Sequence, residues 1–152
     1  MAYARLFDFE ALFAESAPEP RPLSTKAALA VHRYTAEHLD DHVDELNGRL
    51  RAKRDAMLTA LGENFGPAAT RTVPSGGMYI WVTMPEGTDL TGVRRPALDA
   101  SVAFQPGHLF APDGVTGKNC MRFTFGYNSA EEVRDGIVLL ADVFEREGVF
   151  KK

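Results

Sequence analysis

The chain has 152 residues, of which 45% are hydrophobic and 25% charged, and its formal net charge is -4. A chain of this length most simply forms one domain that buries roughly two-thirds of its unfolded surface. The acidic balance gives no reason to expect nucleic acid as a partner, and the apolar runs are too short to span a membrane. The single cysteine, Cys120, cannot form an internal disulfide, which favours a cytoplasmic protein. The N-terminus lacks the basic region followed by an apolar core that is typical of a secretion signal, so we expect no such signal.

The chain changes character near residue 22. Residues 3–14 place Leu6, Phe9 and Phe13 at helical spacing, and three prolines follow between residues 18 and 22. Prolines remove backbone donors and push the preceding residue into extended geometry. We therefore expect an N-terminal amphipathic segment and proline-rich linker over residues 1–22, followed by one domain over residues 23–152.

Helical signals dominate the start of that domain. One begins at Ser24 or Thr25, which are typical N-cap residues. A longer helix is predicted from about residue 41 to residue 61, because apolar side chains recur there at intervals of three, four and seven. Gly62 and the glycine-proline pair at 66–67 are expected to end this helix.

Strand signals follow. Residues 70–73 lead through the turn signal at 74–77 into a strand over 78–83, in which Tyr79, Trp81 and Thr83 share one face. Residues 90–100 predict a helix that Pro96 makes short or kinked. Residues 102–104 predict a brief strand that ends at a turn at 106–107.

The run of residues 119–128 places one arginine inside an apolar strand. Side-chain alternation puts Phe123 and Phe125 on one face, and Arg122 and Thr124 on the other. The planar fork of an arginine matches the two oxygens of a carboxylate, and its charge does not titrate away. The alternative is that Arg122 lies on the solvated side of an edge strand.

The last helix is specified most clearly. Ser129 and Glu132 form a capping box, and Gly148 follows the final apolar position. The apolar stripe between them consists of Val133, Ile137, Leu140, Ala141 and Phe144. The order of helices and short strands predicts an α+β fold, a two-layer sandwich with a small, mostly antiparallel sheet covered by helices.

Other chemistry finds little support. His38 and His42 are four residues apart, as in zinc-binding helices, but Leu39 stands where the metalloprotease motif has its glutamate. We therefore expect no metal site. No catalytic residue is assigned within this chain.

The segments at 23–30, 54–58, 74–82, 102–107 and 121–125, followed by the capped helix, resemble in their order the C-terminal small domain of fold-type I aminotransferases. Within these class I/II enzymes the resemblance is to the 2-aminoadipate and MocR-like branch. It covers roughly residues 23–148.

The resemblance implies transfer of an amino group between an amino acid and a 2-oxo acid through pyridoxal phosphate. It implies that Arg122 binds the carboxylate of the amino acid or 2-oxo acid. It also places Gly76 and Gly77 at the active-site mouth, where the alternative is a simple turn before a strand.

The chain departs from the family in one respect. Pyridoxal chemistry needs a lysine, which in the family lies in a large domain upstream. The lysines here are Lys26, Lys53, Lys118, Lys151 and Lys152. Only the sequence around Lys26 faintly resembles the region of the family's cofactor-binding lysine. It fits better the family segment at which the chain re-enters the small domain, matched here by residues 23–30.

We therefore expect a small domain that binds no pyridoxal phosphate and is inactive alone. A separate large-domain polypeptide would complete it. Without one, the face that such a domain would cover is expected to be apolar and to favour self-association. The alternative is a non-catalytic module that reuses the fold to bind a carboxylate or a protein.

Overall fold

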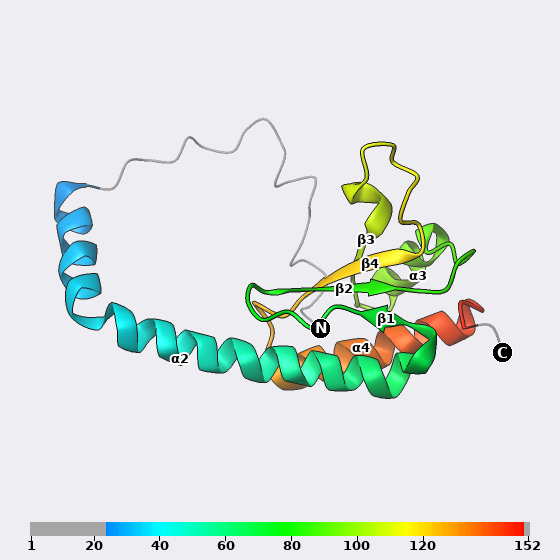
Figure 1. Cartoon of the computed structure of the whole chain (residues 1–152), viewed down its shortest axis with the longest axis horizontal. Helices are drawn as coiled ribbons and strands as arrows, with labels where there is room; N and C mark the ends of the chain where they lie inside the picture. The colour runs from blue at the N-terminus through cyan, green and yellow to red at the C-terminus, as the bar shows by residue number, and fades with distance from the viewer. Residues whose placement is uncertain (1–23, 151–152) are drawn as a thin grey trace. The chain divides into compact units, whose positions relative to one another are not determined.

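The computed structural model describes residues 24–150 (Figure 1). The chain divides into two compact units, Met1–Asn47 and Gly48–Lys152, and each is described by itself below. The predicted amphipathic segment and linker at residues 1–22 lie outside the described residues, so the boundary at residue 22 stays a prediction.

A single helix, α2 (Thr25–Phe65), replaces the two helices predicted for this part of the sequence. The separate start near residue 41 was wrong, because no proline lies between residues 24 and 66 to interrupt the helix. The Ser24 hydroxyl accepts a hydrogen bond from the Ala27 amide at 3.3 Å, as its capping role predicts. The helix runs through Gly62 and ends at Phe65, just before Gly66, whose φ of +59° is left-handed.

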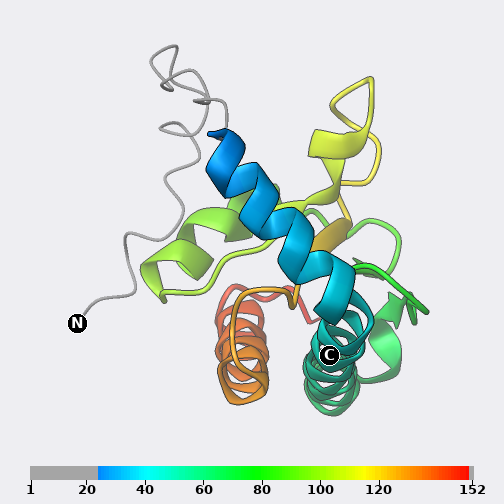
Figure 2. The ribbon, with the colours of Figure 1, turned by 90° about the vertical axis from the view of Figure 1, so that its left-hand side faces the viewer.

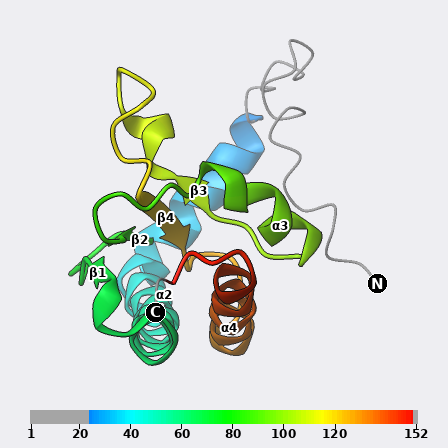
Figure 3. The ribbon, with the colours of Figure 1, turned by 90° about the vertical axis from the view of Figure 1, so that its right-hand side faces the viewer.

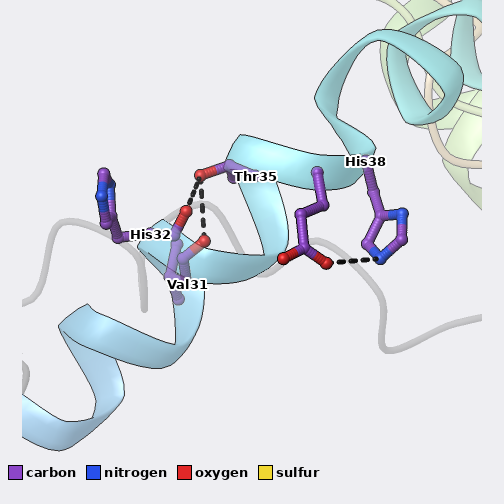
Figure 4. Close-up of polar contacts among 5 residues, drawn as sticks. Val31, His32, Thr35 and His38 are labelled. Carbon is purple, nitrogen blue, oxygen red and sulfur yellow. Dashed lines mark hydrogen bonds and ion pairs between the residues drawn. The ribbon is translucent and has the colours of Figure 1, made fainter.

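Within residues 24–47, most side chains of α2 are exposed. The Thr35 hydroxyl donates to the carbonyls of Val31 and His32, and Glu37 pairs with His38 at 4.0 Å (Figure 4). His38 and His42 do share one continuous helix. Among residues 24–150, however, no group of three or more metal-ligating side chains is placed to hold an ion.

The second unit is built on a four-stranded antiparallel sheet with the order β1-β2-β4-β3. Its strands are β1 (Thr70–Arg71), β2 (Tyr79–Thr83), β3 (Gln105–Pro106) and β4 (Cys120–Thr124). The strand predicted at 102–104 was wrong. Phe104 is buried in the core, and pairing begins one residue later at Gln105. Pro106 is tolerated there because β3 is an edge strand.

Two helices cover one face of this sheet. Figures 2 and 3 show α4 (Ala130–Arg146) and the last part of α2 side by side along that face. They bury the predicted apolar stripe of α4 against the inward side chains of β2 and β4, which include Ile80, Val82, Met121 and Phe123. The capping box of Ser129 and Glu132 is present at the start of α4.

The remaining helices are short. Residues Thr91–Val93 form a 3₁₀ turn, η2, which leads into α3 (Arg94–Asp99). Pro96 is compatible with α3 because it lies in the first turn, where backbone N–H groups have no partner within the helix. The predicted α+β sandwich is confirmed. None of the helices in the described part of the chain is long and apolar enough to cross a membrane.

Candidate functional site

Arg122 occupies the middle of β4, an internal strand with a neighbour on each side. It lies directly opposite Trp81 of β2 and Gln105 of β3. Met121 and Phe123, its chain neighbours, are buried in the core, so the period-two prediction for this strand is confirmed. The alternative that Arg122 belongs to an edge strand is wrong.

Two aromatic rings contact the Arg122 guanidinium. Its Cζ atom lies 4.2 Å from the centroid of the Tyr79 ring and 4.4 Å from that of the Phe110 ring. The Phe110 ring also meets Trp81 edge-on, with centroids 5.7 Å apart. A cation over an aromatic face gains about 0.5–1 kcal/mol at an exposed site. The rings therefore favour one placement of an otherwise flexible side chain.

The two rings come from opposite sides of β4. Tyr79 pairs with Thr124 and is thus the diagonal neighbour of Arg122, within reach of a long side chain. Phe110 belongs to η3 (Gly107–Phe110), a 3₁₀ turn that follows the edge strand β3. Because β4 lies between β2 and β3, one ring reaches Arg122 from β2 and the other from the turn after β3.

No carboxylate among the described residues pairs with Arg122, and its guanidinium makes no hydrogen bond to them. The side chain is only half-buried. A guanidinium carries five N–H donors in a fixed fork and no acceptor. The arrangement can therefore receive an anion from outside the described residues, and a planar carboxylate matches its geometry.

Gly76 and Gly77 lie in the bend before β2, two or three residues from Tyr79. A Cβ atom at either position would meet nothing within 4 Å, so neither glycine permits a close approach between described groups. Gly77 has a φ of +77°, which favours glycine for its conformation. Their location at the active-site mouth stays a prediction.

The three described lysines lie in different surroundings. Lys53 Nζ donates to the carbonyls of Gly126 and Tyr127, at 3.1 and 3.4 Å. Lys118 faces Asp89 at 3.9 Å, and Lys26 is exposed on the separate first unit. Each described lysine of the second unit thus contacts a loop carbonyl or a surface carboxylate.

Tyr79 and Phe110 were not identified from the sequence. Alternation placed Tyr79 on one face of its strand, but only the register with β4 shows that this face carries Arg122. Phe110 follows a strand that was predicted too early, and no local pattern connects it to a residue twelve positions later.

No family profile matches the chain. The aromatic-amino-acid aminotransferase 1 of Thermococcus litoralis is 37% identical over 110 residues, which are 72% of this chain and 26% of the relative. The 2-aminoadipate transaminase of Thermus thermophilus is 31% identical over 109 residues, 72% of this chain and 27% of the relative. The crystal structure of LysN, the alpha-aminoadipate aminotransferase of Thermus thermophilus, matches with a TM-score of 0.71 at 30% identity. It covers 78% of this chain and 30% of that one.

Sequence and fold agree on the class: the chain belongs to the fold-type I pyridoxal-phosphate-dependent aminotransferases and has the fold of their C-terminal small domain. It spans 26–27% of the length of these two curated relatives. The enzymes of this family use pyridoxal phosphate. LysN was crystallised with N-(5'-phosphopyridoxyl)-L-leucine.

Proposed function

We propose that this chain supplies the carboxylate-binding site of an aminotransferase. In this proposal Arg122 binds the α-carboxylate of an amino acid or 2-oxo acid. The observation that carries it is a half-buried guanidinium on an internal strand, in contact with two rings and without a carboxylate partner among residues 24–150. The relatives support the substrate class, because their names describe enzymes acting on α-amino acids.

The contribution of Arg122 is binding and orientation. Two parallel N–H donors to one carboxylate fix the plane of that group, and therefore fix the direction of the substrate's α-carbon. The positive charge persists throughout the range in which enzymes work. The residues described here thus hold one end of a substrate.

We propose that the amine chemistry comes from elsewhere. Lys53 and Lys118 contact other groups of the domain, and the sequence around Lys26 fits the family's lysine region poorly. A separate large-domain polypeptide would then complete the site. Without such a partner, the cytoplasmic 152-residue chain would have no transaminase activity. A carboxylate-binding module without catalysis would use Arg122 in the same way.

The test is a titration of the 152-residue chain with pyruvate at constant ionic strength, followed by NMR. A charge-assisted hydrogen bond contributes about 1.5–3 kcal/mol. A Kd of 1 mM corresponds to about 4.1 kcal/mol, so binding in the range of tens of millimolar is expected. Arg122→Ala should abolish saturable binding. Arg122→Lys keeps the charge but loses the fork, and should bind more weakly than wild type. Equal binding by wild type and Arg122→Ala would refute the proposal.

The proposal that this chain holds no cofactor by itself has its own test. The chain is incubated with pyridoxal phosphate, reduced with borohydride and analysed by mass spectrometry. Scattered substoichiometric labelling of surface lysines is expected. A stoichiometric adduct at one lysine, such as Lys26, would show that the chain holds the cofactor by itself.

A further inference from the structure

We propose that Tyr79 and Phe110 are positioning residues that hold the Arg122 guanidinium for an edge-on approach of the ligand. This inference rests on the proposed function, since it assigns a purpose to the rings around the carboxylate-binding cation. The ring centroids lie 4.2 Å and 4.4 Å from Cζ, inside the roughly 6 Å over which a ring face attracts a cation. Both rings therefore contact the guanidinium directly.

The stacking leaves particular atoms of Arg122 available. In the proposed arrangement the two rings, whose centroids lie 4.2 Å and 4.4 Å from Cζ, cover the π surface of the guanidinium. Its N–H donors then point outward in the guanidinium plane. A ligand can therefore reach the donors along that plane. Such an approach suits the two coplanar oxygens of a carboxylate and disfavours a ligand that binds by stacking on arginine.

The 3₁₀ turn that carries Phe110 packs closely against neighbouring backbone. At Gly107, the first residue of η3, a Cβ atom would lie 2.5 Å from Cys120 Cβ and 2.6 Å from the Gly117 carbonyl oxygen. The turn therefore packs directly on the start of β4, the strand that carries Arg122. Trp81, directly opposite Arg122, supports the Phe110 ring from β2.

Neither ring is needed to fill the core. Tyr79 is 47% exposed and Phe110 is 45% exposed, while the core residues Ile80 and Phe123 of the sheet are nearly fully buried. Large aromatic side chains half in solvent are explained when their faces hold a cation. Their removal should change the behaviour of Arg122 and leave the fold intact.

The experiment follows the Arg122 Nε–Hε signal by NMR in the full chain, together with the pyruvate titration. Ring currents should move this proton upfield in wild type. Tyr79→Ala and Phe110→Leu should each reduce that displacement and weaken pyruvate binding by about two- to fivefold. Phe110→Leu keeps apolar bulk and loses only the π face.

Two variants serve as controls. Tyr79→Phe keeps the ring and should retain the displaced signal, so it separates stacking from any role of the hydroxyl. Tyr127→Ala removes an aromatic side chain that is 69% exposed and is not one of the two rings over the Arg122 guanidinium. It should resemble wild type. Thermal unfolding of every variant confirms that the chain is folded.

An Arg122 signal unchanged by both Tyr79→Ala and Phe110→Leu would overturn the inference. Pyruvate binding that depends on Arg122 but not on either ring would also overturn it. A wild-type chain with a ring-dependent signal and no pyruvate binding would instead refute the proposed function, and leave the hold of the rings on Arg122 established.

Discussion

Trp81 on β2 lies directly opposite Arg122 on β4. The next pair along these strands, Ile80 and Phe123, points into the core. A slip of one residue in this pairing would exchange the two faces, burying the cation and exposing the apolar side chains. The same register therefore specifies both the core and the site, which is how this fold positions a charged group on a rigid support.

The bend before β2 provides a test of why glycine occupies position 77. Gly77→Ala should lower the free energy of unfolding by about 1–2 kcal/mol, because an L side chain is strained at its φ of +77°. Gly77→Asn should cost less, since asparagine tolerates this region. Chemical denaturation gives both values.

Gly76→Ala is the matched control, because position 76 has no left-handed φ and open space around its Cβ. Its stability should stay close to that of wild type. If Gly76→Ala nevertheless weakened pyruvate binding, the predicted location of this glycine at the active-site mouth would gain direct support. A larger loss of stability at 76 than at 77 would contradict the conformational explanation.

Gly107 is required for a different reason, namely the close contact of η3 with the strand β4. Gly107→Ala should destabilise the domain by about 1–3 kcal/mol, the usual cost of overpacking, because its Cβ would meet backbone and Cβ atoms within 2.6 Å. It should also disturb the Arg122 signal through Phe110. Gly92→Ala, in a 3₁₀ turn with nothing within 4 Å, is the control that should do neither. An unchanged melting temperature in Gly107→Ala would show that the turn can move aside.

What could be predicted from the sequence is what depends on local signals. The capping box and apolar stripe of α4 needed only the spacing of residues within one helix, and both are confirmed. The alternation that buries Phe123 and turns Arg122 outward needed only the geometry of one strand. These features follow from the chain's own periodicity.

What could not be predicted depends on pairing between distant segments. Phe110 reaches Arg122 only because β3 pairs with β4 through Gln105 and Pro106, and the sequence predicted this strand at 102–104. The continuity of α2 has a local explanation instead: the sequence predicts two helices, the second from about residue 41, but no proline between residues 24 and 66 separates them. The aromatic surroundings of Arg122 are thus a tertiary property.

The loop between Phe110 and β4 contains Asp113, a carboxyl group that should make the stability of the chain depend on pH. Asp113 accepts hydrogen bonds from the Thr116 hydroxyl at 2.6 Å and from the amides of Val115 and Thr116, both at 2.9 Å. These bonds, that of the Thr116 hydroxyl foremost, favour the carboxylate and lower the pKa of Asp113 from 3.8 to about 2. NMR titration of the Asp113 carboxyl carbon should give a midpoint near this value.

The sign of the stability effect follows from that shift. The pKa of Asp113 is lower in the folded chain than in the unfolded chain, so the unfolded chain binds more protons at pH values between the two. The stability that Asp113 contributes is therefore present above pH 3.8 and is lost as the pH falls towards 2. The melting temperature of wild type should therefore fall more between pH 3.8 and pH 2 than that of Asp113→Asn, which has no carboxyl group to protonate at position 113. Thr116→Val should move the pKa of Asp113 back towards 3.8, whereas Thr88→Val, at a hydroxyl bonded to no described residue, should leave it unchanged. An Asp113 titration midpoint that is the same in Thr116→Val as in wild type would contradict this explanation. The backbone amides alone would then lower the pKa of this carboxyl group, and the turn between Phe110 and β4 would not depend on the threonine hydroxyl.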